Sequence, residues 1–270
     1  MPPRRRLDTE LVRRGLADSR TRAAALIAQG RVHVDGVVAR RASLEVTDRD
    51  LSVAEIAHGP DLASRGGHKL AGALDHWPEI RVDGRRVLDA GASTGGFTDV
   101  LLRRGAAEVV AVDVGAGQLV PRLRDHAHVR VVDRSNVRFL SPQDIGGRSD
   151  LTVCDLSFIS LRLVLGALIA CTGADGDLVA LVKPQFEVGR EALGRGGVVR
   201  DPDDRAAAVE AVAACAGAAG WGGRDVVRSV LPGPAGNVEY FLWLRRGRAT
   251  VDPATIRAIV TAGEGPPATR

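Results

Sequence analysis

Short apolar runs recur along the chain from residue 85 onward, and segments with helical spacing of apolar residues separate several of them. Such runs, rich in Val, Leu and Ala, are typical of buried strands. The predicted strands are RRVLDAG, EVVAVDV, HVRVVD, DLTVCDL and DLVALVKP, and the predicted helices are GFTDVLLRRG, ISLRLVLGALIACTG and DPDDRAAAVEAVAACAGAAG, the last with Asp201 as its cap. Alternating strands and helices predict an α/β fold with a parallel, doubly wound sheet.

The segment DVVRSVLPGPAGNVEYFLWLRR predicts a different connection. Two apolar stretches flank a turn rich in Pro and Gly, which is typical of an antiparallel hairpin. An antiparallel last strand makes the predicted sheet mixed. The residues after this hairpin predict a short helix and a tail.

The first 58 residues predict a small α/β module of their own. One short helix begins near Asp8 and ends at Gly15, and a second helix spans Arg20–Gln29. The segments RVHVDG and VVAR then alternate in polarity around Asp35-Gly36, which predicts a strand, a tight turn and a strand.

Gly59-Pro60 is typical of a linker. We therefore expect a small domain at 1–58, a linker at 59–64 and a large domain at 65–270. The large domain opens with SRGGHKLAGAL, a predicted helix that carries Lys69.

Composition narrows the class of protein. The chain has 270 residues, 45% apolar and 26% charged, which suits one large and one small domain with a sizeable core. Aromatic residues make up only 3%, which argues against single-strand binding by broad aromatic stacking. The three cysteines, Cys154, Cys171 and Cys215, have neither disulfide nor zinc spacing, and the histidines show no metal-ligand pattern. We expect no metal site, no membrane segment and a reducing, cytoplasmic setting.

Positive charge is concentrated at one end of the chain. Residues 1–41 hold ten arginines against four acids, whereas the remainder has two more acids than basic residues. Clustered arginines neutralise phosphates and release counterions, so this end predicts RNA binding, with a solvated surface as the alternative. The candidate RNA-binding residues are Arg4, Arg5, Arg6, Arg13, Arg14, Arg20, Arg22 and Arg31, with Arg65 at the start of the large domain.

The first predicted strand of the large domain runs into the glycine-rich loop DAGASTGGFTD, where a doubly wound sheet binds its ligand. A dinucleotide fingerprint needs glycine at position 93, which is Ser93. A nucleophile elbow matches Gly91 to Gly95, but no histidine follows the later strands to complete a triad. S-adenosylmethionine is the third interpretation, with Asp113 at the end of the second strand as the ribose acid. Asp113 would serve a nicotinamide dinucleotide equally well, and a glycine turn that merely packs is the plainest alternative.

Four charged residues could converge near that loop. Asp155 and Lys183 end the fourth and fifth strands, Glu239 begins the antiparallel strand, and Lys69 precedes the sheet. A ribose hydroxyl is a poor nucleophile and needs a base to attack a sulfonium methyl group. Lysine can be that base where arginine cannot, and lysines are very few in this arginine-rich chain. We expect Lys183 as base, with Lys69, Asp155 and Glu239 orienting it and balancing charge; surface salt bridges are the alternative.

At these residues the sequence resembles the TlyA family of ribosomal RNA ribose methyltransferases, also called hemolysin A-like. The resemblance covers nearly the whole chain, through the motifs SRGGHKL, DAGASTGGFTD, CDLSFISL, LVKPQFEVGR, GGVVRDP and LPGPAGNVEYFLWL and the N-terminal LDTELVRRGLADSRTRAAALIAQGRVHVDG. It implies an S-four-type RNA-binding domain followed by an FtsJ-like methyltransferase domain of the Rossmann-like class I fold.

The resemblance also implies the substrate and the site. It implies S-adenosylmethionine as cofactor and 2′-O-methylation of cytidine in small-subunit or large-subunit ribosomal RNA, or both. Ribosomal subunits are the expected partner, with no obligate protein partner. The family's Lys-Asp-Lys-Glu set falls on Lys69, Asp155, Lys183 and Glu239, and its cofactor site falls on Gly91, Ser93, Thr94, Gly95, Gly96, Phe97, Asp113 and Asp133.

Two other classes of function compete with a methyltransferase. One is an RNA-binding assembly factor that keeps only the fold, which the four intact charged positions disfavour. The other is a membrane-active hemolysin, which the lack of a long apolar span or of a strongly amphipathic basic helix disfavours.

Overall fold

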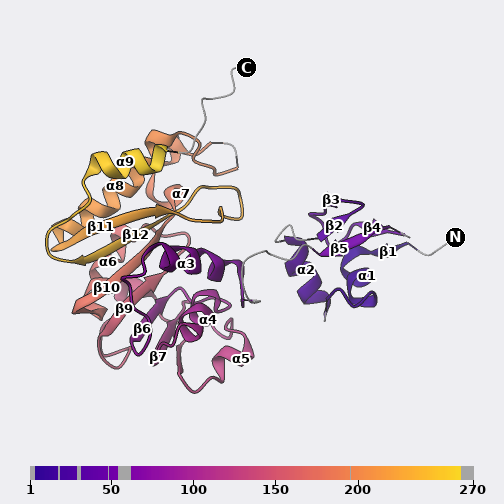
Figure 1. Cartoon of the computed structure of the whole chain (residues 1–270), viewed down its shortest axis with the longest axis horizontal. Helices are drawn as coiled ribbons and strands as arrows, with labels where there is room; N and C mark the ends of the chain where they lie inside the picture. Colours follow the sequence, from indigo (N-terminus) through magenta and orange to yellow (C-terminus); the bar gives the residue numbers. More distant parts are fainter. Residues whose placement is uncertain are drawn as a thin grey trace. The chain divides into compact units, whose positions relative to one another are not determined.

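A computed structural model describes residues 4–17, 19–28, 32–47, 49–53, 62–194 and 196–262. The chain separates into two compact units, Met1–Asp61 and Leu62–Arg270. Residues 59–61 of the expected linker lie outside the described residues, and 62–64 belong to the larger unit. Figure 1 shows the elements of both units.

The smaller unit contains two helices and short strands, as its sequence predicts. Asp35 and Gly36 both have positive φ, 50° and 79°, which is the tight turn that the Asp-Gly pair favours between twisted strands. The described helices are α1 (Leu7–Arg13) and α2 (Arg20–Ala28), and the strands are β1 (Arg5–Arg6), β2 (Val32–Val34), β3 (Val37–Val38), β4 (Glu45–Val46) and β5 (Leu51–Val53). Strands pair as β1-β4 and β3-β2-β5, over a core that includes Leu7, Leu11, Ile27 and Val32.

The larger unit is built on a seven-stranded sheet in the order β11-β12-β10-β9-β6-β7-β8. Strands β6 to β10 pair in parallel, whereas β12 is antiparallel to both of its neighbours, so the predicted mixed sheet is confirmed. The strands are β6 (Arg86–Ala90), β7 (Glu108–Val112), β8 (Val129–Val132), β9 (Ser149–Cys154), β10 (Thr172–Val182), β11 (Trp221–Arg228) and β12 (Tyr240–Arg246).

Helices cover both faces of this sheet. They are α3 (Arg65–His76), α4 (Gly96–Arg103), α5 (Pro121–Arg124), α6 (Leu165–Cys171), α7 (Pro184–Glu187), α8 (Pro202–Ala218) and α9 (Pro253–Thr261), with short 3₁₀ turns η1 (Val137–Phe139), η2 (Leu161–Leu163) and η3 (Arg190–Ala192). Asp201 caps α8 by accepting a hydrogen bond from the Asp203 N–H (2.9 Å), as the sequence predicts.

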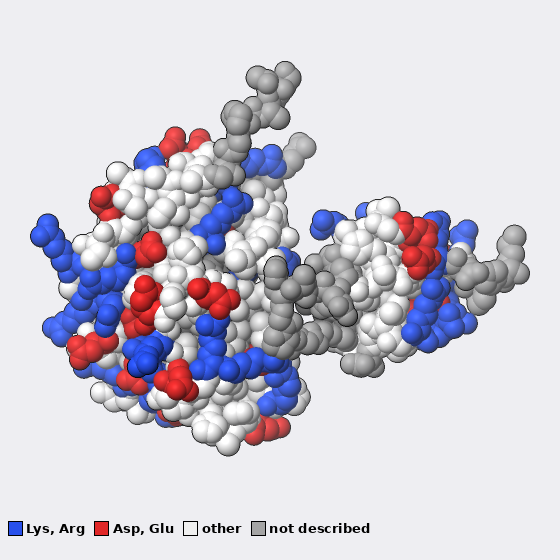
Figure 2. Space-filling view, in the orientation of Figure 1, with Lys and Arg blue, Asp and Glu red and all other residues white. Residues whose placement is uncertain are grey.

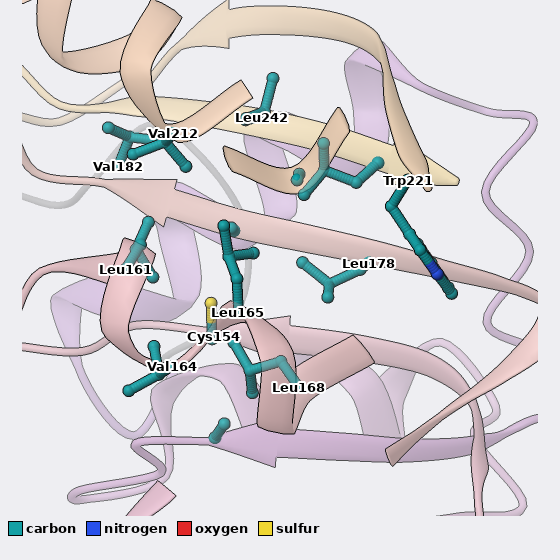
Figure 3. Packing of buried hydrophobic residues seen from close by; sticks show 14 of the residues in the cluster. Cys154, Leu161, Val164, Leu165, Leu168, Leu178, Val182, Val212, Trp221 and Leu242 are labelled. Carbon is teal, nitrogen blue, oxygen red and sulfur yellow. The ribbon is translucent and has the colours of Figure 1, made fainter. Parts of the chain in front are cut away.

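Successive strand residues alternate between two hydrophobic clusters, one on each face of the sheet. One cluster includes Leu88, Cys154 and Leu178 and is covered by α6, α8 and α9, as Figure 3 shows for part of it. The other includes Val87, Val153 and Val179 and is covered by α3 and α4. Cys154 and Cys171 are buried, and burial raises the pKa of the Cys154 thiol to about 12, so Cys154 packs as a small apolar residue.

Two searches bear on the excluded classes of function. Among the described residues no helix is long and apolar enough to cross a membrane. Over the same ranges, no three or more His, Cys, Asp or Glu side chains are grouped so that they could hold a metal ion.

Candidate active site

A pocket of about 480 Å³ opens at the carboxyl ends of β6, β7 and β9, where a doubly wound sheet binds its ligand. Loops after four strands supply its walls. The lining residues are Gly91, Ser93, Asp113, Val114, Gln118, Ser135, Asn136, Val137, Asp155, Leu156, Ser157, Phe158, Ile159 and Val164.

The glycine-rich loop after β6 approaches the loop after β9 closely. Gly91 has a φ of 90°, and a Cβ there would lie 2.7 Å from the Asp155 carbonyl oxygen, so only glycine fits. Gly91 and Ser93 line the pocket. The predicted cofactor residues Thr94, Gly95, Gly96 and Phe97 are not among the lining residues; Gly96 and Phe97 begin α4, and the Phe97 ring packs against Phe241 in the core.

Asp113 faces the pocket with both carboxylate oxygens already engaged. Oδ2 accepts a hydrogen bond from the Ser93 N–H (2.8 Å), and Oδ1 accepts one from the Gly115 N–H (2.7 Å). Asp133, the other predicted acid, instead accepts from the Gly117 N–H (2.9 Å) and is not among the lining residues.

The segment after β8 supplies Ser135, Asn136 and Val137 to the pocket. Sequence reasoning named none of them. Their signal is weak, a short polar stretch after a strand, and it does not distinguish a ligand wall from an ordinary turn.

Lys183 and Asp155 form an ion pair beside the pocket. Lys183 Nζ lies 2.6 Å from Asp155 Oδ1 and donates a hydrogen bond to Ser157 Oγ (2.8 Å). Asp155 and Ser157 themselves line the pocket. The Lys183 side chain is 10% exposed and that of Asp155 is 22% exposed, so the pair is reachable from solvent.

Lys69 and Glu239 form a second ion pair, which is more deeply buried. Lys69 Nζ donates to Glu239 Oε2 at 2.5 Å, and their side chains are 7% and 1% exposed. A Cβ on Gly233 would lie 2.5 Å from Glu239 Oε1, so the loop before β12 covers the carboxylate.

The two ion pairs lie in the same region of the sheet. Val182 pairs with Tyr240 across β10 and β12, so Lys183 and Glu239 come one residue beyond the same cross-strand pair. A Cβ on Gly66, in the first turn of the helix that carries Lys69, would lie 3.5 Å from Asp155 Oδ2. The expected convergence is therefore present, as two pairs rather than one cluster with Lys69 against Lys183.

Asp89, on β6, is a buried acid that the sequence analysis did not single out. Its side chain is fully buried, and Oδ2 accepts a hydrogen bond from the Thr98 hydroxyl (2.6 Å). Burial raises the pKa of Asp89 to about 7, and the nearby Asp155 carboxylate raises it further while the Thr98 hydrogen bond lowers it.

Phe158 presents its ring to solvent at the wall of the pocket. The residue is 91% exposed, and its φ of 64° lies in the left-handed region that a bulky residue rarely adopts. Glu187, buried on α7, fixes this loop by accepting hydrogen bonds from Ser160 Oγ (2.5 Å) and the Leu161 N–H (2.6 Å). The Phe158 ring also lies 5.2 Å from the Phe186 ring, centroid to centroid.

The arginines predicted to bind RNA are not a free cationic surface. In the smaller unit, Asp8 and Glu10 form ion pairs with Arg5, Arg6, Arg13, Arg14 and Arg20, and Arg4 lies 3.8 Å from Glu45. In the larger unit, Arg65 donates to the Pro232 carbonyl oxygen (3.4 Å). The Arg22 side chain and all of Arg31 lie outside what the structure describes.

Comparisons with known proteins match both units. Residues 62–246 match the FtsJ-like methyltransferase model, and residues 5–51 match the S4 domain model. The chain is 56% identical over 245 residues, 91% of each chain, to the 16S/23S rRNA (cytidine-2′-O)-methyltransferase TlyA of Mycobacterium tuberculosis. It is 40% identical to a candidate rRNA methyltransferase, YqxC, of Bacillus subtilis, over 88% of this chain and 85% of the relative.

A solved structure agrees with these matches. A candidate hemolysin from Streptococcus thermophilus superposes with a TM-score of 0.76 at 36% identity, over 96% of this chain and 95% of that chain.

Proposed function

This chain belongs to the TlyA family of FtsJ-like methyltransferases with an S4 domain, and we propose that it transfers a methyl group from S-adenosylmethionine to the ribose 2′-hydroxyl of a cytidine in ribosomal RNA. The pairing of Lys183 with Asp155 beside the pocket is the observation that carries this proposal. It places a lysine where a hydroxyl and a methyl donor can meet.

The pocket fits the cofactor. Its volume of about 480 Å³ is in the range of small-molecule sites, and it combines apolar walls with a few polar groups. Asp113 is placed to accept hydrogen bonds from a ribose diol, and Gly91 and Ser93 allow the backbone to approach the ligand. When bound, S-adenosylmethionine supplies an electrophilic methyl group on a positively charged sulfur.

Lys183 is the proposed base. In its neutral amine form Nζ accepts the proton of the target hydroxyl, which makes the oxygen nucleophilic. The Asp155 carboxylate, 2.6 Å away, is placed to take up the proton that the ammonium must first give up. Ser157 Oγ fixes the direction of Nζ through its 2.8 Å hydrogen bond.

Lys69 and Glu239 act as positioning residues in this scheme. Their pair is nearly closed to solvent and ties α3 to the start of β12, next to Lys183 in the sheet register. A rigid pair at this place holds the neighbouring Lys183–Asp155 pair in one geometry.

Phe158 is proposed to stack on the base of the target nucleotide. A single exposed ring beside the pocket suits an unstacked base, because every base has a π-face and stacking needs no groove. The S4 unit would bind the surrounding ribosomal RNA, and the cytoplasm, where ribosomal subunits assemble, is the proposed compartment.

The test uses purified small and large ribosomal subunits, labelled cofactor and three forms of the full chain. We expect the wild type to methylate a cytidine ribose, and the labelled subunit identifies the substrate. Lys183→Ala should lose transfer by more than about a hundredfold while S-adenosylhomocysteine still binds. Lys183→Arg is the matched control, because it keeps the charge and cannot act as a base. Near-normal transfer by the Arg variant would refute the base assignment.

Lysine-selective spectroscopy gives a second readout. Lys69 and Lys183 are the only lysines in the chain, so a protein labelled with ¹⁵N at lysine Nζ shows two side-chain signals. Addition of S-adenosylhomocysteine should shift the Lys183 signal more than the Lys69 signal, because the Lys183 partners Asp155 and Ser157 line the pocket. An equal response would place both lysines at the ligand.

A further inference from the structure

Two buried carboxylates lie beneath a group of arginines in the smaller unit. Asp8 and Glu10, in the first turn of α1, have side chains only 6% exposed. The arginines around them are mostly near half exposed. Their side-chain exposures are 46% for Arg5, 50% for Arg6, 56% for Arg13, 26% for Arg14 and 61% for Arg20.

Asp8 holds two guanidinium groups from different elements. Arg6, at the end of β1, donates to Asp8 through Nε and Nη2, both at 3.1 Å. Arg20, the first residue of α2, donates through Nη2 at 3.1 Å. The Thr9 N–H donates to Asp8 Oδ1 (2.9 Å), so the carboxylate itself is fixed by the helix backbone.

Glu10 holds three more arginines. Arg13 binds it in a two-pronged geometry, with Nε at 2.8 Å and Nη2 at 2.6 Å. Arg14 donates through Nε at 2.8 Å, and Arg5 Nε lies 3.8 Å away. Five guanidinium groups against two carboxylates leave the cluster with a net charge of three positive units.

These arginines keep the carboxylates ionised at any pH near neutrality. The hydrogen bond from Arg6 holds the pKa of Asp8 well below its usual range, and the hydrogen bonds from Arg13 and Arg14 lower the pKa of Glu10 to about 2. The cluster therefore keeps one charge state when RNA arrives.

A free arginine side chain has many rotamers, and about 2 kcal/mol of rotamer entropy is lost when it is fixed on a ligand. A carboxylate behind the guanidinium removes that cost beforehand, since Nε and one Nη bind inward and the remaining N–H groups face solvent. Figure 2 shows the charged side chains of the smaller unit gathered mainly along one side of it, beside a face without charge.

We propose that Asp8 and Glu10 are positioning residues, which hold Arg5, Arg6, Arg13, Arg14 and Arg20 as a preset surface for the phosphate backbone of RNA. This inference rests on the proposed function, in which the S4 unit binds ribosomal RNA. Its content is that two negative charges increase the affinity for a polyanion.

The test therefore has a sign opposite to simple charge counting. Asp8→Asn and Glu10→Gln each raise the net charge by one, and long-range attraction alone predicts tighter binding to deproteinised ribosomal RNA. We expect each variant of the full chain to bind about tenfold more weakly. Asp50→Asn, an exposed acid of the same unit, is the matched control and should bind as tightly as the wild type or more tightly.

The salt dependence separates positioning from loss of folding. Each lost phosphate contact should make the slope of log K against log salt shallower by about 0.7–0.9. A partly unfolded small unit would instead lower the affinity by one factor at all salt concentrations and leave the slope unchanged. Asp8→Glu, which keeps the charge, should restore much of the affinity.

The outcomes distinguish this inference from the function it rests on. Unchanged or tighter binding by both Asp8→Asn and Glu10→Gln, or weaker binding with an unchanged slope, overturns the positioning role. If Arg20→Gln binds ribosomal RNA like the wild type, the smaller unit does not bind RNA through this surface, and the proposed role of the S4 unit fails first.

Discussion

Lys69 and Glu239 meet at 2.5 Å although 170 residues separate them in the chain. Lys69 comes from the helix before the sheet and Glu239 from the start of the only strand that runs against its neighbours, as far as the structure describes the sheet. The contact closes one side of the candidate site and leaves Lys183 and Asp155 as the accessible pair.

Removal of one member of the buried pair should destabilise the protein strongly. Lys69→Met or Glu239→Met leaves an uncompensated buried charge, which costs about 3–5 kcal/mol. The double variant should recover most of the stability, because both charges are gone. Urea unfolding measures this, with Asp75→Asn as control, since Asp75 is the 71% exposed partner of Arg104. Single variants that cost less than about 1 kcal/mol would show that water reaches the pair.

Asp113 should control the affinity for the methyl donor. Loss of a charge-assisted hydrogen bond to the ribose costs about 1.5–3 kcal/mol, so Asp113→Ala should bind S-adenosylhomocysteine about ten- to a hundredfold more weakly in calorimetry. Asp133→Ala is the matched control, because Asp133 follows the next strand and is not among the lining residues. A larger loss for Asp133→Ala would move the cofactor acid to that strand and restore the adenine role predicted for it.

Asp89 should make stability depend on pH. Burial raises its pKa from 3.8 to about 7, so the folded state binds this proton more tightly than the unfolded state. The unfolding free energy therefore falls as pH rises from about 4 to about 7, by about 3 kcal/mol between about pH 5 and about pH 8.

Asp89→Asn should remove that contribution, because an amide accepts the Thr98 hydrogen bond without ionising. Urea unfolding at the two pH values is the measurement, and Asp125→Asn, at an exposed acid, should change the difference little. A wild-type difference that persists in Asp89→Asn would assign it to other groups.

Phe158 should matter for RNA and not for folding. Stacking on one base contributes about 1–3 kcal/mol, so Phe158→Ala should lower kcat/KM for the ribosomal subunit by about five- to 150-fold. The thermal transition should not move, because the ring is 91% exposed. Phe139→Ala removes another exposed ring, 74% exposed and not among the lining residues, and should leave kcat/KM near the wild-type value.

Much of the fold could be predicted from local patterns. The strands β6, β7, β9 and β10, the helix α8 with its Asp201 cap and the Asp35-Gly36 turn all follow from rules that act over a few residues. Strand-end positions also indicated that Asp155 and Lys183 would meet, because parallel strands end at one edge.

Other contacts depend on placement that no local pattern contains. The insertion of β12 between β10 and β11 brings Glu239 next to Lys183, and that strand order follows from packing of the whole sheet. The same holds for the carboxylates under the arginines. Composition showed a basic end, yet Asp8 meets Arg20 only because α1 packs on α2.

The division has one physical cause. Hydrophobic periodicity, caps and turns act between residues near in sequence, so the order and type of the elements are present in the chain itself. Ion-pair partners, pocket walls and the burial that raises the pKa of Asp89 depend on which surfaces meet when the elements pack. The residue types of the site could therefore be named from the sequence, whereas tertiary structure decided that Lys69 pairs with Glu239 and Lys183 with Asp155.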